Sequence, residues 1–190
     1  MSYLEELAAQ YGTDKGSHGY LPFYERHLGD LRDIRLLEIG VQDGASLRMW
    51  SDWIPGAEIV GVDISAACAQ LALPHNVSVV ITDVKVYKPA APFNVIIDDG
   101  SHHASDVVTA IGRLWDSLTS GGWYVIEDWQ VQFTALYGGT QNGSDATDLA
   151  RRTLYRILSG GPSAAAELHA YAKILFLRKR ESRDNNKETE

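Results

Sequence analysis

The sequence predicts an α/β fold built around a mainly parallel β-sheet. Short apolar runs alternate along the chain with longer stretches whose apolar residues recur at helical spacing, which is the pattern of successive βαβ units. The run Val95–Ile97 marks the clearest strand, because an unbroken apolar stretch indicates burial on both faces of a sheet. The chain has 190 residues, 45% of them hydrophobic, which suits one ordinary domain. We therefore expect a single domain over residues 1–180 and a polar, disordered tail over residues 181–190.

Each expected element follows from its local pattern. The strands are predicted, in chain order, at residues 35–39, 58–64, 77–82, 93–98, 123–127, 167–172 and 173–180. Helices are predicted at residues 44–54, 65–73, 105–117 and 146–158, with a turn at Gly121–Gly122 and a mobile, glycine-rich loop over 133–144. The result is a seven-stranded sheet whose first five strands alternate with other segments and should be parallel. The last two strands follow one another directly, so the sheet should include an antiparallel C-terminal strand.

Residues 1–30 precede the first strand and form a separate segment. Residues 2–11 and 21–28 have helical patterns, and residues 11–18 between them have the composition of a loop. A Rossmann-like core, which the alternating pattern predicts, does not require this extension. We therefore expect a helical lid over the ligand site.

Charge and apolar patterning argue against several classes of partner. The net charge of −8 disfavours nucleic acid, because phosphate binding requires a concentrated positive surface. No apolar run approaches the roughly 20 residues of a membrane span, and the N-terminus has no charged-then-apolar leader. The single cysteine, Cys68, excludes an internal disulfide. We expect a cytoplasmic protein without membrane or nucleic-acid partners.

The turn after the first strand carries the first candidate binding residues. Gly40 and Gly44 permit a tight turn and let a ligand approach the backbone. Gln42 stands where the dinucleotide fingerprint has its second glycine, and Glu38 suits a cationic ligand better than a pyrophosphate. A strand that ends in Glu-x-Gly is typical of class I methyltransferases, whose cofactor S-adenosylmethionine carries a sulfonium and an ammonium group. The candidate cofactor contacts in this turn are Glu38, Gly40, Asp43 and Ser46.

Acidic residues also end the following strands. Asp63, 19 residues after Gly44, stands where a carboxylate can bind both ribose hydroxyls of an adenosine group. Asp83 ends the third strand, where it can contact adenine, and Asp98 ends the fourth. Each acid could instead cap a loop or a helix. Because acids end three successive strands at the edge where such sheets bind ligands, the pattern favours a cofactor site.

A second group of acids predicts a metal site. Asp99 follows the fourth strand, and Glu127 and Asp128 end the fifth, so three carboxylates should converge in one cleft. Three carboxylates in one cleft repel each other, and protonation, a basic partner or a bound cation relieves that repulsion. Among cations, Mg²⁺ prefers oxygen ligands. A metal there could lower the pKa of a substrate hydroxyl. His102, in the same loop, could take its proton, with His103 as the alternative base or a helix cap.

Four sequence blocks together resemble the metal-dependent sugar O-methyltransferases. The blocks are Gly12–Gly16 with His18–Tyr24, Leu37–Val41, Ile97–His103 and Val125–Asp128, and the resemblance covers about residues 10–180. The family includes mycinamicin and macrocin tailoring enzymes, cephalosporin hydroxylase-like proteins and a mycobacterial methylmannose-polysaccharide 1-O-methyltransferase. The resemblance implies that Asp99, Glu127 and Asp128 bind Mg²⁺ and that His102 is the base.

The same resemblance implies further properties. In the family the N-terminal segment often completes the cofactor site, which makes Thr13, Lys15 and Gly16 candidate contacts for S-adenosylmethionine. The acceptor would be a small molecule or an oligosaccharide, methylated on a sugar hydroxyl, and the protein a homodimer. The compact length is most similar to the mycobacterial enzyme, so the 1-hydroxyl of a 3-O-methylmannose polysaccharide precursor is the expected target.

Two other functions remain open. A catechol-type methyltransferase also uses strand-end acids and a metal, and needs an aromatic gate for a flat phenol. Residues that could form the gate are Trp123, Tyr124, Trp129, Phe133 and Tyr137. A non-catalytic regulatory protein that only binds the cofactor would show neither turnover nor dependence on metal.

Overall fold

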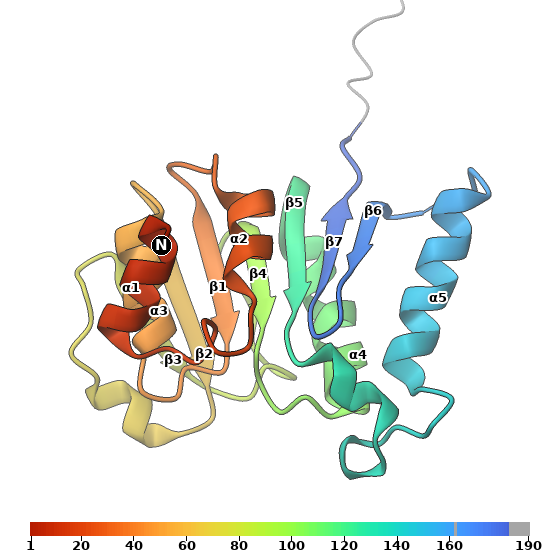
Figure 1. Ribbon diagram of the computed structural model, residues 1–190, viewed down its shortest axis with the longest axis horizontal. Helices are drawn as coiled ribbons and strands as arrows, with labels where there is room; N and C mark the ends of the chain where they lie inside the picture. The colour runs from red at the N-terminus through yellow and green to blue at the C-terminus, as the bar shows by residue number, and fades with distance from the viewer. Residues whose placement is uncertain (162, 183–190) are drawn as a thin grey trace, which may run out of the picture.

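The computed structural model describes residues 1–161 and 163–182, and its centre is a twisted sheet (Figure 1). The strands are β1 (Arg35–Ile39), β2 (Glu58–Asp63), β3 (Val77–Ile81), β4 (Phe93–Asp98), β5 (Leu118–Ile126), β6 (Ala165–Ala170) and β7 (Leu175–Lys179). Within the described residues they form one seven-stranded sheet in the order β3-β2-β1-β4-β5-β7-β6. Strands β1 to β5 are parallel, whereas β7 is antiparallel to both β5 and β6. The predicted fold class, with its antiparallel C-terminal strand, is confirmed.

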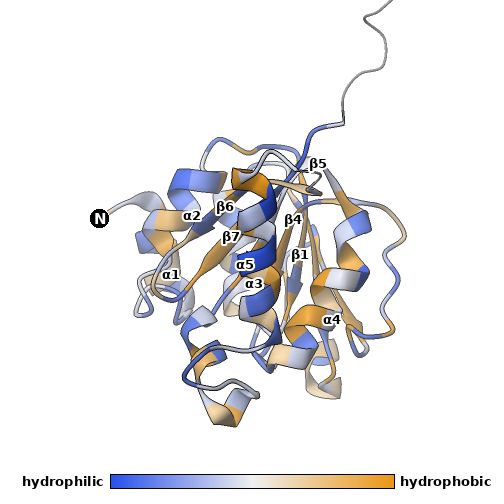
Figure 2. Ribbon diagram, turned by 90° about the vertical axis from the view of Figure 1, so that its right-hand side faces the viewer, coloured by the Kyte–Doolittle hydropathy of each residue, from blue (hydrophilic) through white to orange (hydrophobic). Residues whose placement is uncertain are grey.

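Helices cover both faces of this sheet. They are α1 (Tyr3–Tyr11), α2 (Leu21–Leu28), α3 (Ala45–Trp53), α4 (Ala104–Leu114) and α5 (Asp145–Leu158). Successive side chains of a strand point to opposite faces, so Leu36 and Val95 join a core with α1, α2 and α3. Leu37 and Ile96 join a second core with α4 and α5. Figure 2 shows that α5 is hydrophilic along most of its length and hydrophobic at one end, in keeping with the exposure of Leu154 and Leu158.

The N-terminal segment is packed into the first of these cores. Helix α1 begins at a capping box, in which Ser2 Oγ accepts from the Glu5 N–H and the Glu5 carboxylate accepts from the Ser2 N–H. Leu4 in α1 and Tyr24 in α2 are fully buried. The segment expected as a lid therefore covers the sheet, and only its loop, residues 12–15, reaches the ligand cavity described below.

Three predicted elements differ from the structure. The helix expected over 65–73 is only a 3₁₀ turn, Ala66–Gln70, because Cys68 is its one buried residue and little burial stabilises a longer helix. Strand β5 begins at Leu118, so Gly121–Gly122 lies inside the strand at a register shift rather than in a turn. The loop expected over 133–144 follows a 3₁₀ turn at Trp129–Phe133 and contains another at Ala135–Tyr137.

The predicted tail, residues 181–190, lies outside the described residues from 183 onward. In the part of the chain that the structure describes, no helix combines the length and apolar character needed to cross a membrane.

Candidate active site

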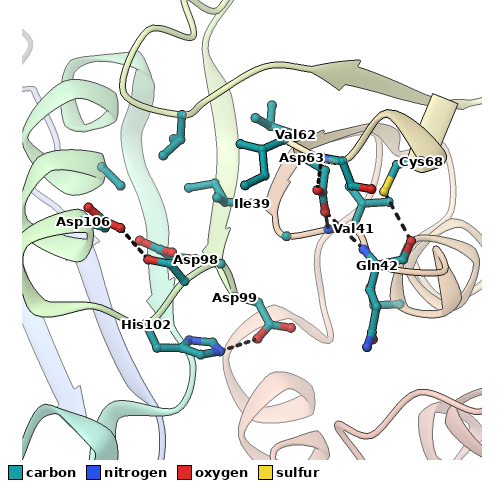
Figure 3. A pocket seen from close by; sticks show the side chains of 18 of the residues that line it. Ile39, Val41, Gln42, Val62, Asp63, Cys68, Asp98, Asp99, His102 and Asp106 are labelled. Atoms are coloured by element: carbon teal, nitrogen blue, oxygen red, sulfur yellow. Dashed lines mark hydrogen bonds and ion pairs between the residues drawn. The ribbon is translucent and has the colours of Figure 1, made fainter. Parts of the chain in front are cut away.

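A cavity of about 1050 Å³ lies at the carboxyl edge of the parallel strands. The predicted site residues that border it are Thr13, Lys15, Gly40, Asp43, Ser46, Asp63, Asp83, Asp98, Asp99, His102 and Asp128. Figure 3 shows Asp63 and Gln42 on one side of the cavity and Asp98, Asp99 and His102 on the other. The remaining three predicted residues, Gly16, Glu38 and Glu127, are not among the lining residues.

The turn after β1 forms one wall of the cavity. Gly40 has a φ of +89°, and a Cβ atom there would lie 2.1 Å from the carbonyl oxygen of Asp99, so only glycine fits. Asp63 Oδ2 accepts from the N–H groups of Val41 (2.7 Å) and Gln42 (3.2 Å), and Oδ1 accepts from Ser65 N–H. Burial alone would raise the pKa of Asp63, but these backbone hydrogen bonds lower it overall. Asp63 is therefore a fixed anion that also holds the turn.

Glu38 lies behind this wall and does not reach the cavity. Its side chain is fully buried, Oε2 accepts from Trp50 Nε1 at 2.9 Å, and Oε1 lies 3.1 Å from Lys15 Nζ. Burial raises the pKa of Glu38, against the opposing effect of Lys15. The sequence predicted a cationic ligand, the cofactor, beside Glu38; in the structure the cation beside it is Lys15 of the same chain.

Lys15 contacts three carboxylates at once. Although the residue borders the cavity, its own surface is 0% exposed. Its Nζ lies 2.7 Å from Asp99 Oδ2 and 2.8 Å from Glu127 Oε1, in addition to Glu38. Burial by itself lowers the pKa of Lys15, but the three carboxylates raise it well above its usual range. The lysine therefore stays charged and provides a basic partner for the acids at the strand ends.

Glu127 points toward the N-terminal segment. Its Oε1 accepts hydrogen bonds from Lys15 Nζ and from the Tyr24 hydroxyl. Burial raises the pKa of Glu127; Lys15 opposes this, while Asp99 and Glu38 add to it, so the pKa stands well above its usual range. A further positive charge near these acids would favour their ionised forms.

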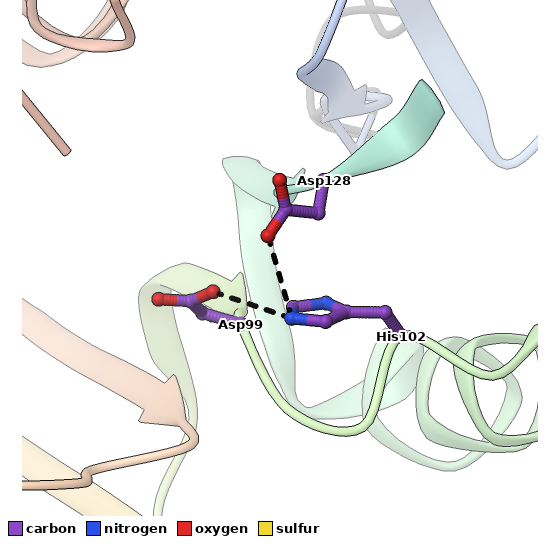
Figure 4. A group of neighbouring side chains, drawn as sticks. All are labelled: Asp99, His102 and Asp128. Atoms are coloured by element: carbon purple, nitrogen blue, oxygen red, sulfur yellow. Dashed lines mark ion pairs between the residues drawn. The ribbon is translucent and has the colours of Figure 1, made fainter. Parts of the chain in front are cut away.

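Asp99, His102 and Asp128 converge at the other end of the cavity (Figure 4). His102 Nε2 lies 3.4 Å from Asp128 Oδ2 and 4.0 Å from Asp99 Oδ1. One ligand atom from each residue lies within 4.8 Å of the other two, a spacing that could hold a metal ion. Two carboxylates with one imidazole suit a divalent cation, and the carboxylates favour a hard one such as Mg²⁺. The adjacent His103 is at the N-cap position of α4 and lies outside this group.

Asp128 is held in place by two neighbours. Its Oδ1 accepts from the Tyr20 hydroxyl at 2.8 Å and from Gln130 Nε2 at 3.0 Å. Burial would raise the pKa of Asp128, but these hydrogen bonds and the nearby His102 lower it overall. Tyr20 and Tyr24 were not predicted from the sequence as site residues, because tyrosines at and just before an apolar helix usually belong to the core.

The cavity wall also contains an ion pair that the sequence did not predict. Lys85 Nζ lies 2.6 Å from Asp106 Oδ1, and Ser101 Oγ donates to Asp106 Oδ2 at 2.7 Å. Lys85 follows β3 and Asp106 lies in the first turn of α4, so the pair joins two segments across the cavity rim. The position of Lys85 two residues after Asp83 was the available signal for this contact.

The five aromatic residues considered as a gate are separated. Tyr124 is fully buried in the sheet, and Trp123 and Trp129 are also buried. Phe133 is exposed, and the ring of Tyr137 lies 6.3 Å from that of His102. Of the five, Tyr137 is therefore the one whose ring lies near the candidate base.

Sheet order, glycine turn and strand-end acids together define a Rossmann-like, class I methyltransferase fold. Residues 37–129 match the family model of a methyltransferase domain. The chain is 36% identical over 152 residues to L-olivosyl-oleandolide 3-O-methyltransferase of Streptomyces antibioticus, which covers 72% of this chain and 39% of that protein. It is 30% identical over 206 residues to 8-demethyl-8-alpha-L-rhamnosyl tetracenomycin-C 2'-O-methyltransferase of Streptomyces olivaceus. That match covers 93% of this chain and 54% of the relative.

The chain is also similar to a methyltransferase of known structure. The MycE methyltransferase from the mycinamycin biosynthetic pathway, in complex with Mg, SAH and mycinamycin VI, matches with a TM-score of 0.85 at 28% identity. The match covers 96% of this chain and 55% of that chain, so this chain spans about half the length of such relatives, or less. The chain carries a methyltransferase domain homologous to named sugar O-methyltransferases, which confirms the resemblance at that level. The narrower likeness to the mycobacterial enzyme stays a prediction.

Proposed function

We propose that this chain transfers a methyl group from S-adenosylmethionine to a hydroxyl group of a sugar or glycoside, with a divalent cation at the strand-end acids. The observation that carries the proposal is the convergence of Asp99, His102 and Asp128 in the same cavity that Gly40 and the turn after β1 line. Homology to sugar O-methyltransferases supports the reaction.

The charge of the site supports the cation. Among the described residues, Lys15 contacts Glu38, Asp99 and Glu127. A fourth carboxylate, that of Asp128, belongs to the residue directly after Glu127 in the sequence. In their ionised forms these four carboxylates exceed the positive charge of one lysine, and a divalent ion can neutralise the excess. The Mg in the MycE complex gives this reading independent support.

Each part of the cavity then has a role. The turn at Gly40 and the carboxylate of Asp63 would hold the cofactor, with Asp83 near its adenine, and Thr13, Asp43, Ser46 and Asp98 as further contacts. Asp99 and Asp128 would hold the cation, with Glu127 beside them. When bound, S-adenosylmethionine supplies an electrophilic methyl group and Mg²⁺ makes the acceptor hydroxyl more acidic.

His102 would act as the general base. Its Nε2 takes the proton of the acceptor hydroxyl as that oxygen bonds to the methyl carbon and the carbon–sulfur bond breaks. The products are the methyl ether, S-adenosylhomocysteine and protonated His102, which returns its proton to solvent. Asp128 Oδ2 and Asp99 Oδ1 lie 3.4 Å and 4.0 Å from this nitrogen, so the base lies beside the proposed cation site.

Finer properties stay predictions. These are the acceptor position, including the 1-hydroxyl of a 3-O-methylmannose polysaccharide precursor, the homodimer, and the extent of the domain over residues 1–180. A methyl-transfer assay with rhamnosyl and mannose-polysaccharide acceptors, and sedimentation of the purified chain, would test them.

The cation is tested by removing its ligands one at a time. We expect Asp99→Asn and Asp128→Asn to lower methyl transfer at least about 10²-fold, because a metal supplies several kcal/mol of transition-state stabilisation. Binding of S-adenosylhomocysteine should change little. The matched control is Asp116→Asn, which makes the same change at an exposed position.

Three results would contradict the proposal. Full activity of the native chain in excess EDTA would exclude a metal-dependent reaction. Transfer to catechol but to no glycoside would favour the phenol-type enzyme. Cofactor binding without turnover on any acceptor would favour a regulatory binding protein.

A further inference from the structure

Two tyrosines of helix α2 and its N-terminal flank reach the acids at the end of β5. Tyr20 is 1% exposed and Tyr24 is fully buried, and both hydroxyls donate to carboxylates. The Tyr20 hydroxyl donates to Asp128 Oδ1 at 2.8 Å and accepts from the Asp128 N–H at 3.2 Å. The Tyr24 hydroxyl donates to Glu127 Oε1. The N-terminal segment therefore contacts each of the two acids through a separate hydroxyl.

These contacts select one oxygen of each acid. Tyr20 and Gln130 occupy Asp128 Oδ1, and it is the other oxygen, Oδ2, that lies 3.4 Å from His102 Nε2. Lys15 likewise occupies Asp99 Oδ2, and Oδ1 is the oxygen that faces His102. Lys15 and Tyr24 both contact Oε1 of Glu127. On both Asp128 and Asp99, the contact from the N-terminal segment falls on one oxygen, and the oxygen near His102 is the other one.

We propose that Tyr20 and Tyr24 are positioning residues for the cation site: Tyr20 fixes Asp128 so that its Oδ2 is presented to the ion, and Tyr24 fixes the preceding residue, Glu127, at the end of β5. A carboxylate without such a partner can rotate about its side-chain bonds and offer either oxygen, which weakens a site of fixed geometry. Hydrogen bonds from outside the ligand shell typically change metal affinity about 10–100-fold. The inference rests on the proposed function, because it requires that a divalent cation binds here.

The fold supports this role for the N-terminal segment. Tyr24 packs against Trp50 of α3, with ring centroids 4.8 Å apart, and against Phe176 of β7 at 5.6 Å. The aromatic ring is thus fixed by the core on both sides, and its hydroxyl has a defined position. Replacement by phenylalanine removes the hydroxyl while the ring and its packing remain.

The test is Mn²⁺ binding to the full chain without substrate, measured by calorimetry and by electron paramagnetic resonance of the free ion. We expect Tyr20→Phe and Tyr24→Phe each to raise the dissociation constant for Mn²⁺ about tenfold. Affinity for S-adenosylhomocysteine should stay within about twofold, since neither tyrosine borders the cavity. Tyr11→Phe is the matched control: it removes a hydroxyl that donates to Asp52 in α3, outside the acid cluster.

The outcomes separate the two levels of the proposal. If the native chain does not bind Mn²⁺, the metal-dependent function itself fails. If the native chain binds Mn²⁺ and a variant binds it equally well, the positioning role of that tyrosine is overturned. A parallel loss of thermal stability and of both affinities would show a merely structural role and would also overturn the inference.

Discussion

Left-handed backbone at residues other than glycine is concentrated around the cavity. Gln42, His102 and Asp128 have φ angles of 53°, 58° and 50°. This conformation costs roughly 1–2 kcal/mol for an L-residue, so the surrounding contacts must hold each one. Asp63 binds the N–H of Gln42, Gln132 Nε2 donates to the carbonyl of His102, and Tyr20 accepts from the N–H of Asp128. Of the four such residues in the described part of the chain, His102 and Asp128 have roles in the proposed reaction, Gln42 lies in the turn after β1, and Asp33 lies outside the cavity lining.

At this scale the role of His102 can be measured. We expect His102→Ala to lower methyl transfer about 10²–10⁴-fold, the usual share of a general base. Because His102 Nε2 also lies near two acids, the affinity for Mn²⁺ should be measured in the same variant. An unchanged metal affinity is expected of a base, whereas a large loss would make His102 a ligand. His103→Ala is the control, and a larger effect there would move the base to His103.

At the scale of elements, local patterns predicted what local burial determines. Strands β1 and β4 begin and end where expected, because their apolar runs are buried on both faces. The 3₁₀ turn at Ala66–Gln70 and the bulged start of β5 depend on neighbouring segments, which periodicity does not report. The cavity-lining acids were predicted for a related reason: parallel strands bring their carboxyl ends to one edge whatever the rest of the chain does.

The contacts of the N-terminal segment were harder to predict. Lys15 was expected to contact the cofactor, and in the structure it binds Glu38, Asp99 and Glu127. These contacts join residues 23 to 112 positions apart, and their pairing depends on how α1 and α2 dock on the sheet. A single sequence contains no signal for such docking, so the basic partner of the acids could not be assigned.

One helix cap is connected to the candidate base. Ser144 caps α5, where its Oγ accepts from Thr147 N–H, and the same hydroxyl donates to Gln132 Oε1 at 3.0 Å. Gln132 in turn donates to the carbonyl oxygen of His102 at 2.8 Å. We expect Ser144→Ala to lower the free energy of unfolding by about 0.5–2 kcal/mol, as for other caps. It should also lower the rate of methyl transfer, because His102 loses indirect support.

The capping box of α1 provides the matched control for this change. Ser2→Ala removes the same kind of cap at a site outside the cavity lining. Urea unfolding should show a similar loss of stability in both variants, while only Ser144→Ala slows the reaction. Equal rates in the two variants would show that the cap of α5 does not influence His102.

At the scale of the whole molecule, the two ends of the described chain pack together. His27 of α2 lies against the C-terminal strands: its Nε2 is 2.9 Å from the Tyr171 hydroxyl, and its ring centroid is 4.5 Å from that of Phe176. Phe23 stacks on Tyr171 at 3.8 Å. The N-terminal segment that supplies Lys15, Tyr20 and Tyr24 is therefore fixed partly by β7 and by the turn between β6 and β7, so the stability of this contact bears on the site.

Acid should weaken that contact through His27. Burial, with the nearby His169 and Arg26, lowers the pKa of His27 to about 4, although Glu167 opposes the shift. An unfolded histidine has a pKa of about 6.5, so between pH 6.5 and 4 the unfolded chain binds more protons than the folded one. The contribution of neutral His27 is complete above about pH 6.5 and is lost as the pH falls toward 4. One such group changes the free energy of unfolding by at most about 1.4 kcal/mol per pH unit.

Urea unfolding at pH 7, 6 and 5 tests this prediction. His27→Gln removes the titrating group, so its free energy of unfolding should fall less between pH 7 and pH 5 than that of the native chain. His75→Gln makes the same change at an exposed histidine after η1 (Ala66–Gln70) and should leave the native profile unchanged. If His27→Gln keeps the full acid sensitivity, other groups cause it. If the free energy of unfolding of His27→Gln depends less on pH, as expected, then protonation of His27 in the contact between α2 and the C-terminal strands limits the stability of the fold in mild acid.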